Sequence, residues 1–236
     1  MGLGALRPLL GAVRRDRRGR VRLPLAELTR QRLDWARRLQ AIAQNGLHYT
    51  QSDFERERFE EVREIAAELG SSFDNGGDDT LEELQTTFAA ESGHACPKID
   101  VRAAAFRDGR VLLVQGRDDG RWTLPGGWAE VGESPRRAVE KELREESGYR
   151  GRATKLVSVV ERDLRDRPRW PFYAWKLYFL CELDDTPPAP PQASEILEVG
   201  FFGPDELPEL SPRTPADHLA FVVTHSFDPA LPTFFE

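Results

Sequence analysis

Three glutamates in the middle of the chain carry the clearest chemical signal. Glu142, Glu145 and Glu146 fall in a stretch that we expect to be helical, where they lie within about 100° of one another around the axis. Carboxylates this close repel each other, and the i,i+4 pair Glu142/Glu146 lowers helix stability. Such a cluster is tolerated best where cations neutralise it. Oxygen ligands without His or Cys favour hard ions, Mg²⁺ or Mn²⁺.

The helix that would carry these glutamates has clear limits. Ser134 is a good N-cap, Pro135 a good first helical residue, and Gly148 ends the helix. The face opposite the glutamates is apolar and can pack on a sheet. The preceding Gly126-Gly127 lets the backbone approach a metal and phosphates closely. A solvated acidic helix would fit the glutamates equally well, so the cluster alone leaves both interpretations open.

The segment from Gly127 to Tyr149 resembles the Nudix box, Gly-x5-Glu-x7-Arg-Glu-U-x-Glu-Glu-x-Gly-U, where U is a bulky apolar residue. The residues in register are Gly127, Glu133, Glu142, Leu143, Glu145, Glu146, Gly148 and Tyr149. The departure is Lys141, where the family pattern has Arg. Lysine keeps the charge but loses the planar fork, and at i,i+4 it can pair with Glu145. We therefore expect that the lysine changes the electrostatics of the site and that activity is retained.

The resemblance extends upstream of the box. Residues 33–69 are similar to the helical N-terminal domain of one Nudix subgroup, whose members are hydrolases of nucleoside diphosphates linked to another moiety, including ADP-ribose and CDP-choline types. The resemblance implies a Nudix fold, a mixed β-sheet sandwiched between helices (α+β or α/β), preceded by a small all-helical domain. It also implies hydrolysis of the pyrophosphate bond to give a nucleoside monophosphate and phospho-X.

The same resemblance assigns roles within the site. Glu142 and Glu146 would be the main ligands of Mg²⁺ or Mn²⁺, with Glu145 and the Gly126 carbonyl as further ones. The carboxylate that takes the proton of water would be Glu145, or else Glu195 or Glu198 after the proline-rich loop 187–191. The residues with structural roles in the box would be Gly127, Glu133, Lys141 and Gly148.

Aromatic side chains offer candidates for stacking on a base. Trp128 and Phe172 are our substrate-binding candidates, although alternation along 172–183 favours core packing for most aromatics there. ADP-ribose enzymes of the family often have Pro fifteen residues past the box. Here Leu164 holds that position, which lowers the weight of ADP-ribose.

Helices are expected before the box and strands around it. A first helix should stop at Asn45-Gly46 and carry on one buried face Leu28, Trp35, Leu39, Ile42 and Ala43. Two more should open with capping boxes at Ser52/Glu55 and Thr80/Glu83. Strands are expected at 101–105, 111–114, 156–160, 173–183 and 199–202, followed by helical turns near 205–207 and 216–223.

We divide the chain into a basic tail (1–24), a helical domain (25–93), a Nudix domain (97–224) and a C-terminal tail (225–236).

Composition narrows the function classes. The chain has 236 residues, a net charge of −7 and a pI near 5.3, which disfavours general nucleic-acid binding. Residues 1–22 are the exception, with seven arginines against one aspartate. We interpret them as a disordered tail, with phosphate contact as the alternative.

No apolar run is long enough for a membrane span, and no secretory signal precedes the arginines, so we expect a cytoplasmic protein. Cys96 and Cys181 make neither a disulfide framework nor a zinc site.

Three other functions stay open. They are a nucleoside triphosphate pyrophosphohydrolase, a non-catalytic Nudix module that senses a ligand, and an RNA-acting hydrolase that would give the arginine-rich tail a purpose. The intact box carboxylates disfavour the sensor, and the helical domain disfavours the triphosphate enzyme. A nucleotide is the expected partner, and a homodimer is plausible because the helical domain alone has a small core.

Overall fold

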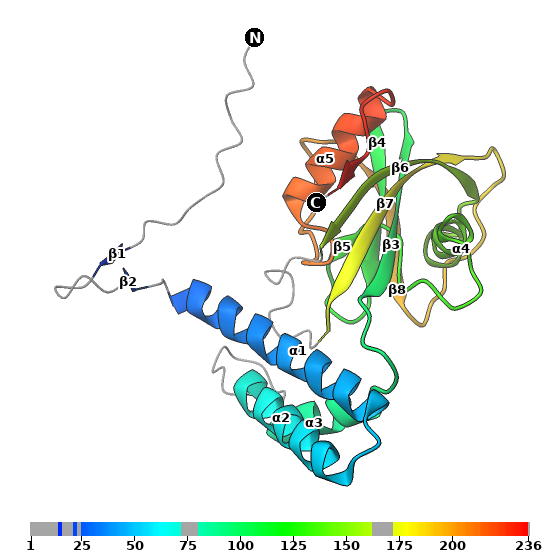
Figure 1. The fold of residues 1–236 in the computed structure, drawn as a ribbon. Coiled ribbons are helices and arrows are strands. Elements are labelled where there is room, and N and C mark those ends of the chain that lie inside the picture. The colour runs from blue at the N-terminus through cyan, green and yellow to red at the C-terminus, as the bar shows by residue number, and fades with distance from the viewer. Residues whose placement is uncertain (1–13, 16–20, 23–24, 72–79, 162–171, 236) are drawn as a thin grey trace. The chain divides into compact units, whose positions relative to one another are not determined.

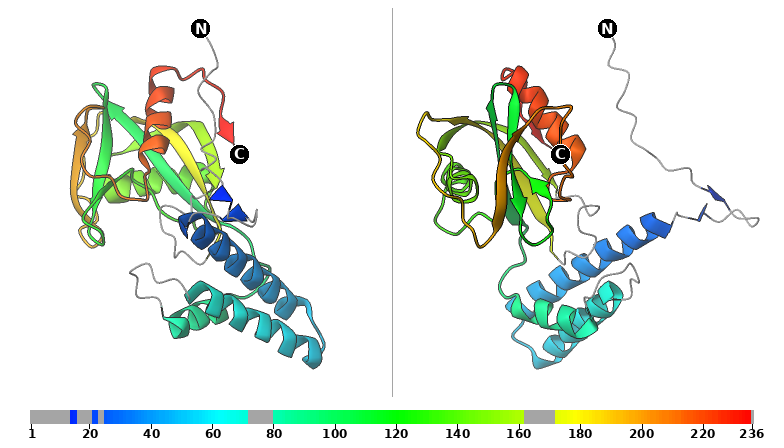
Figure 2. Two further views of the ribbon diagram at one scale, coloured as in Figure 1. Left: turned by 90° about the vertical axis from the view of Figure 1, so that its left-hand side faces the viewer. Right: turned by 180° about the vertical axis from the view of Figure 1, so that it is seen from behind.

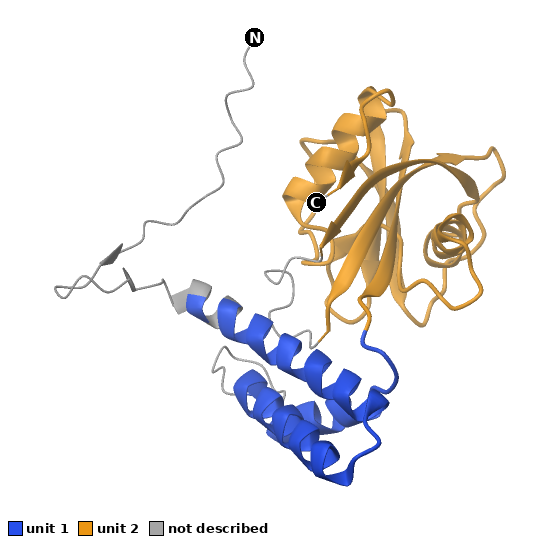
Figure 3. Ribbon diagram, in the orientation of Figure 1, with its two compact units in different colours: residues 1–95, 168–171 blue, residues 96–167, 172–236 orange. Residues whose placement is uncertain are grey.

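The computed structural model describes residues 14–15, 21–22, 25–71, 80–161 and 172–235. The chain divides into two compact units, one of residues 1–95 with 168–171 and one of residues 96–167 with 172–236 (Figure 3). We call them the helical unit and the sheet unit. Within the described residues, no helix combines the length and the apolar character needed to cross a lipid bilayer.

The helical unit contains three helices, α1 (Leu25–Tyr49), α2 (Asp53–Ser71) and α3 (Leu81–Ala90), preceded by the short strands β1 (Arg14–Arg15) and β2 (Val21–Arg22). The helices pack in sequence, α1 on α2 and α2 on α3. The core contains Leu33, Ala36, Ala43, Ala66, Ala67, Leu84 and Phe88. The capping box at Thr80/Glu83 is confirmed. At the start of α2 only half a box forms, because Glu55 accepts a hydrogen bond from the Thr50 hydroxyl at 2.6 Å.

The predicted buried face of α1 is only partly correct, because Ala43 is buried as expected but two of the large side chains are not. Trp35 and Ile42 are 42% and 55% exposed. The inward face instead includes buried Gln40 and Gln44, whose amides donate to the carbonyl oxygens of Phe88 (3.2 Å) and Gly93 (3.1 Å). An apolar periodicity cannot identify a face that is partly built from hydrogen-bonded amides.

The predicted stop at Gly46 is also wrong, since α1 continues to Tyr49. A Cβ atom at Gly46 would lie 2.3 Å from the ring of Phe59 in α2. The glycine therefore serves the close approach of two helices, and its usual role as a helix terminator does not apply here.

The sheet unit is built on a mixed seven-stranded sheet (Figure 1). Its strands are β3 (Lys98–Arg107), β4 (Arg110–Gly116), β5 (Trp122–Thr123), β6 (Gly151–Glu161), β7 (Ala174–Leu183), β8 (Ile196–Phe202) and β9 (Phe234–Phe235). The order is β5-β4-β3-β7-β6-β9, with β8 paired to β4. β3 runs parallel to β7 and antiparallel to β4, to which the predicted turn at Asp108-Gly109 joins it.

Two helices, α4 (Pro135–Ser147) and α5 (Ala216–Phe227), cover opposite faces of the sheet (Figure 2). Alternate residues of β3 supply the two cores. Val101, Ala103 and Ala105 pack toward α4, whereas Ala104 packs toward α5. The predicted fold class, a sheet between helices preceded by a helical region, is confirmed.

The end of the chain differs from the predicted tail at 225–236. α5 continues to Phe227 with His225 buried, and β9 pairs in parallel with β6. Lys155 of β6 also donates to the carbonyl oxygens of Pro229 (2.6 Å) and Leu231. These long-range contacts, which no local pattern reveals, make residues 225–235 part of the sheet unit. Residues 205–207, predicted as a helical turn, form a turn that precedes α5.

Candidate functional site

Helix α4 begins and ends where its sequence predicts. The Ser134 hydroxyl accepts a hydrogen bond from the Arg137 amide at 3.3 Å, and Pro135 is in the first turn. Gly148 is left-handed, with φ 74°, and a Cβ there would lie 1.8 Å from the Ala189 carbonyl oxygen. The first turn of the glutamate-bearing helix is therefore fixed by local capping, and its last turn by a left-handed glycine that also packs against Ala189.

The glycine loop before α4 is held against the edge of β3. The amides of Val101 and Ala103 donate to the carbonyl oxygens of Gly127 (2.9 Å) and Pro125 (2.8 Å). This pairing puts the glycines against the glutamates. The Gly126 amide donates to Oε2 of Glu146 at 2.8 Å, and a Cβ at Gly127 would lie 3.1 Å from the Glu142 carboxylate.

Glu142 and Glu146 share an electrostatically unusual environment. Burial raises the pKa of each carboxyl to about 7, and Arg102 is the group that most opposes the rise. Glu195 adds to the rise for both, and Glu142 adds to it for Glu146. Two acids that are hard to ionise together form a place where a bound cation would be stabilised.

The donors present fit a hard divalent cation. The two carboxylates and the nearby glycine loop offer oxygen atoms, and Mg²⁺ in proteins is typically held by one or two carboxylates with water and phosphate completing the shell. Among the described residues, no group of three His, Cys, Asp or Glu side chains converges closely enough to hold an ion alone.

The three candidate proton acceptors differ in position. Glu145 is ion-paired with Arg144 at 2.9 Å, and its backbone oxygen accepts from the Gln192 amide. Glu195 lies near enough to act electrostatically on both Glu142 and Glu146. Glu198 lies on β8 opposite Gln115 and is exposed. The structure thus brings Glu195 closer to the carboxylate pair than Glu198.

Lys141 contacts Glu130 at 3.2 Å and Glu133 at 3.4 Å. The predicted pairing of Lys141 with Glu145 is therefore wrong, because the loop that precedes α4 folds back to offer nearer carboxylates. Lys141 and Glu133 together tie this loop to the helix.

The two aromatic candidates lie beside the first residues of β3. Trp128 forms an isolated bridge with Asp100 and is 37% exposed. The ring of Phe172 lies under the Lys98 ammonium at 4.7 Å. Leu164 lies outside the described residues.

A buried ion pair beneath the loop was not anticipated from the sequence. Asp100 and Arg102 in β3 are 2% and 4% exposed, and their closest atoms are 2.6 Å apart. The available signal was two opposite charges at i,i+2 beside the apolar run 103–106, a spacing that places both charges on one face of the strand.

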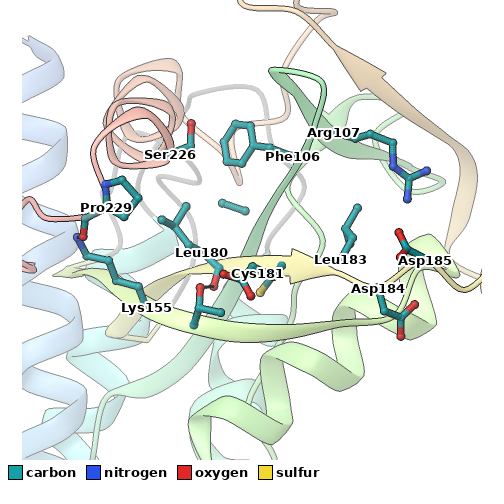
Figure 4. A pocket seen from close by; sticks show the side chains of 13 residues that line it. Phe106, Arg107, Lys155, Leu180, Cys181, Leu183, Asp184, Asp185, Ser226 and Pro229 are labelled. Carbon is teal, nitrogen blue, oxygen red and sulfur yellow. Dashed lines mark hydrogen bonds between the residues drawn. The ribbon is translucent and has the colours of Figure 1, made fainter.

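A cavity of about 680 Å³ lies elsewhere in the sheet unit. Its lining comes from the last residues of β3 and β7, from β6 and from the end of α5, and includes Phe106, Lys155, Leu180 and Ser226 (Figure 4). No residue of α4 lines it. The cavity is thus separate from the glutamate site.

Residues 97–222 match the family model of the NUDIX domain, and residues 30–86 match a UDP-X-like, N-terminal oligomerisation domain. The putative ADP-ribose pyrophosphatase YjhB of Bacillus subtilis is 35% identical over 181 residues, which cover 77% of this chain and 85% of that protein. The crystal structure of a UDP-X diphosphatase is 30% identical, covers 88% of this chain and 99% of its own, and has a TM-score of 0.54. An ADP-ribose pyrophosphatase from Streptococcus suis is 36% identical with a TM-score of 0.53, over 60% of this chain and 100% of its own.

Proposed function

The chain belongs to the Nudix hydrolase family, and from that premise we propose that it hydrolyses the pyrophosphate bond of nucleoside diphosphates joined to a second group, X. The products would be a nucleoside monophosphate and phospho-X, with CDP-choline and ADP-ribose types as the leading substrates. The supporting observation is the Glu142–Glu146 pair beside the glycine loop. The match to a UDP-X-like N-terminal domain and the names of the relatives support the X-linked class.

In this proposal Glu142 and Glu146 hold Mg²⁺ or Mn²⁺, with Glu145 and the Gly126 carbonyl as further donors. When bound, the metal neutralises the diphosphate and lowers the pKa of the attacking water. The Gly126 amide fixes the orientation of the Glu146 carboxylate. Lys141 and Glu133 hold the preceding loop in place on α4.

The proton of the attacking water goes to a carboxylate of this chain. We favour Glu195, because it acts on both glutamates of the pair, whereas Glu145 is paired with Arg144. Glu198 is the weaker candidate since it lies within β8, opposite Gln115, whereas Glu195 precedes that strand. Trp128 and Phe172, beside the start of β3, are placed to stack on a base or sugar.

A substrate panel in ¹⁸O-labelled water with Mg²⁺ tests the proposal. The panel contains CDP-choline, ADP-ribose, a UDP-sugar and the nucleoside triphosphates. Each substrate is given to the wild type and, as the control, to the Glu142→Gln/Glu146→Gln variant. Label should enter one of the two phosphates of an X-linked diphosphate, with no free orthophosphate. Much faster release of pyrophosphate from triphosphates would contradict the substrate class and leave the family intact.

We also propose that the helical unit joins two copies of the chain. Trp35, Ile42 and Tyr49 of α1 follow one another at seven-residue intervals, which puts them on one side of the helix, and they are 42%, 55% and 62% exposed. Exposed apolar side chains gathered along one helix face are typical of an association surface. The description of the matched N-terminal family as an oligomerisation domain supports a second copy as the occupant.

A further inference from the structure

The Asp100–Arg102 pair lies beneath the loop that contacts Glu146. The guanidinium of Arg102 binds Asp100 through two hydrogen bonds, Nε to Oδ1 at 2.6 Å and Nη2 to Oδ2 at 2.8 Å. Because both side chains are buried, this bidentate geometry is not weakened by solvent, and removing either partner would leave an uncompensated charge.

The remaining donors of Arg102 reach the loop. Nη1 donates to the Leu124 carbonyl at 3.2 Å and approaches the Thr123 hydroxyl at 3.5 Å. Thr123 and the Leu124 amide are in turn bonded to the Thr214 hydroxyl, at 2.8 Å and 3.1 Å. The backbone just before Pro125 is thus fixed from two sides by buried polar groups.

Gly126 packs closely against Val101 and Arg102 of β3. Its φ is 151°, and a Cβ there would lie 2.0 Å from the Val101 carbonyl oxygen and 2.9 Å from the Cα of Arg102. The Gly126 amide then donates to Glu146. A continuous set of contacts therefore runs from Asp100 through Arg102 and the loop to the Glu146 carboxylate.

Charge adds a second consequence. The positive charge of Arg102 favours the ionised form of Glu146, yet among the described residues the hydrogen bonds of Arg102 go to Asp100, Thr123 and Leu124 and none goes to Glu146. Asp100 accepts from Nε and Nη2 and the Leu124 carbonyl accepts from Nη1, so the donors of the guanidinium are engaged away from Glu146.

We propose that Asp100 and Arg102 are positioning residues of the metal site: they fix residues 124–126 beneath Glu146 and keep the guanidinium on Asp100, so that Glu146 remains available to a divalent cation. The inference rests on the proposed function only in assigning a cation to Glu146. Outer contacts of this kind typically change metal affinity or activity by about 10–100-fold when they are altered.

Three variants test it. Arg102→Lys keeps the charge but loses the fork. Asp100→Asn keeps the shape and releases the guanidinium toward Glu146, which raises the local positive charge. Arg107→Lys, at the exposed end of the same strand, is the matched control. Mn²⁺ binding to the metal-free proteins is measured by calorimetry, folding by circular dichroism, and kcat and KM at saturating Mg²⁺ with CDP-choline and ADP-ribose.

We expect about 10-fold or greater loss of Mn²⁺ affinity and of kcat in Arg102→Lys and Asp100→Asn, little change in KM, and wild-type behaviour in Arg107→Lys. Folded variants that bind Mn²⁺ as the wild type does would overturn the inference. So would failure of both to fold, since the pair would then serve folding alone. If the wild type binds Mn²⁺ but cleaves no nucleotide of the panel, the proposed function fails while the binding comparison still decides the role of the pair.

Discussion

At the scale of single residues, Glu142 and Glu146 combine unfavourable electrostatics with good local positioning. Their burial and mutual repulsion destabilise the ionised forms, while the Gly126 amide stabilises the charge on Glu146. Among the described residues neither carboxylate has a direct cationic partner, and burying such a pair lowers the stability of the fold relative to a neutral pair. The two carboxylates are therefore best explained as ligands of the proposed cation.

Replacing Glu146 with Gln tests that explanation. Turnover should fall by two or more orders of magnitude, on the order of 3 kcal/mol, because a ligand of the proposed metal loses its charge. The thermal stability of the metal-free protein should hold or rise, since repulsion with Glu142 is relieved. Glu182→Gln, an exposed change on β7, is the control. Wild-type turnover of Glu146→Gln at saturating Mg²⁺ would remove Glu146 from the site.

The pKa values of the pair predict a pH dependence of stability. In the folded, metal-free protein both carboxyls have a pKa near 7, above the ordinary value of 4.5, so the folded state binds more protons than the unfolded state between these values. The pair therefore adds to the free energy of unfolding when it is protonated. This contribution is fully present below about pH 4.5 and is lost as the pH rises through about 7. Melting temperatures in EDTA should show this loss from pH 5 to 8.

The double variant Glu142→Gln/Glu146→Gln isolates the contribution of the pair from that of the other titrating groups. Its melting temperature should change less over the same pH range, and Mg²⁺ should raise the melting temperature of the wild type alone. Identical pH profiles for the two proteins would show that the pair does not titrate as inferred.

At the scale of elements, short-range chemistry was predictable and long-range contacts were not. The ends of α4 follow from Ser134, Pro135 and Gly148, each of which acts within a few residues. The glycine loop faces the glutamates because it pairs with β3 more than twenty residues earlier. The Asp100–Arg102 pair and the face of α1 likewise depend on tertiary partners, so periodicity alone misassigned or missed them.

Gly46 shows how packing can outweigh helix propensity. In an isolated helix, alanine is about 1 kcal/mol more favourable than glycine. At this position the new Cβ would meet the Phe59 ring at 2.3 Å, so Gly46→Ala should destabilise the helical unit by about 1–3 kcal/mol in urea denaturation. Phe59→Leu in the same chain should recover part of the loss. A Gly46→Ala protein more stable than the wild type would show that α1 and α2 separate easily.

At the scale of the whole molecule, the proposed chemistry belongs to the sheet unit alone. The basic segment 1–22 is distinguished by its seven arginines against one aspartate. Its deletion should leave hydrolysis of small nucleotides within about two-fold of the wild type, because the composition of the segment predicts a solvated arm that takes no part in the site. Removal of 33–93 should instead impair solubility or activity, because that region holds an apolar core of its own. Loss of small-nucleotide hydrolysis in the shorter deletion would assign the arginines to the site.

Self-association is the property that the helical unit would add to the molecule, and its test separates assembly from catalysis. Trp35→Ser/Ile42→Ser changes two exposed side chains of α1 and no residue of its buried face, so the unit should still fold. Phe227→Ser, which removes an aromatic ring that is 73% exposed on the sheet unit, is the matched control. In analytical ultracentrifugation at micromolar concentration, the wild type and the control should sediment as dimers and the α1 variant as a monomer. Turnover per chain should persist in that monomer, because the glutamates and the glycine loop belong to one copy. A monomeric wild type, or an α1 variant that still dimerises, would exclude this face of α1 as the interface.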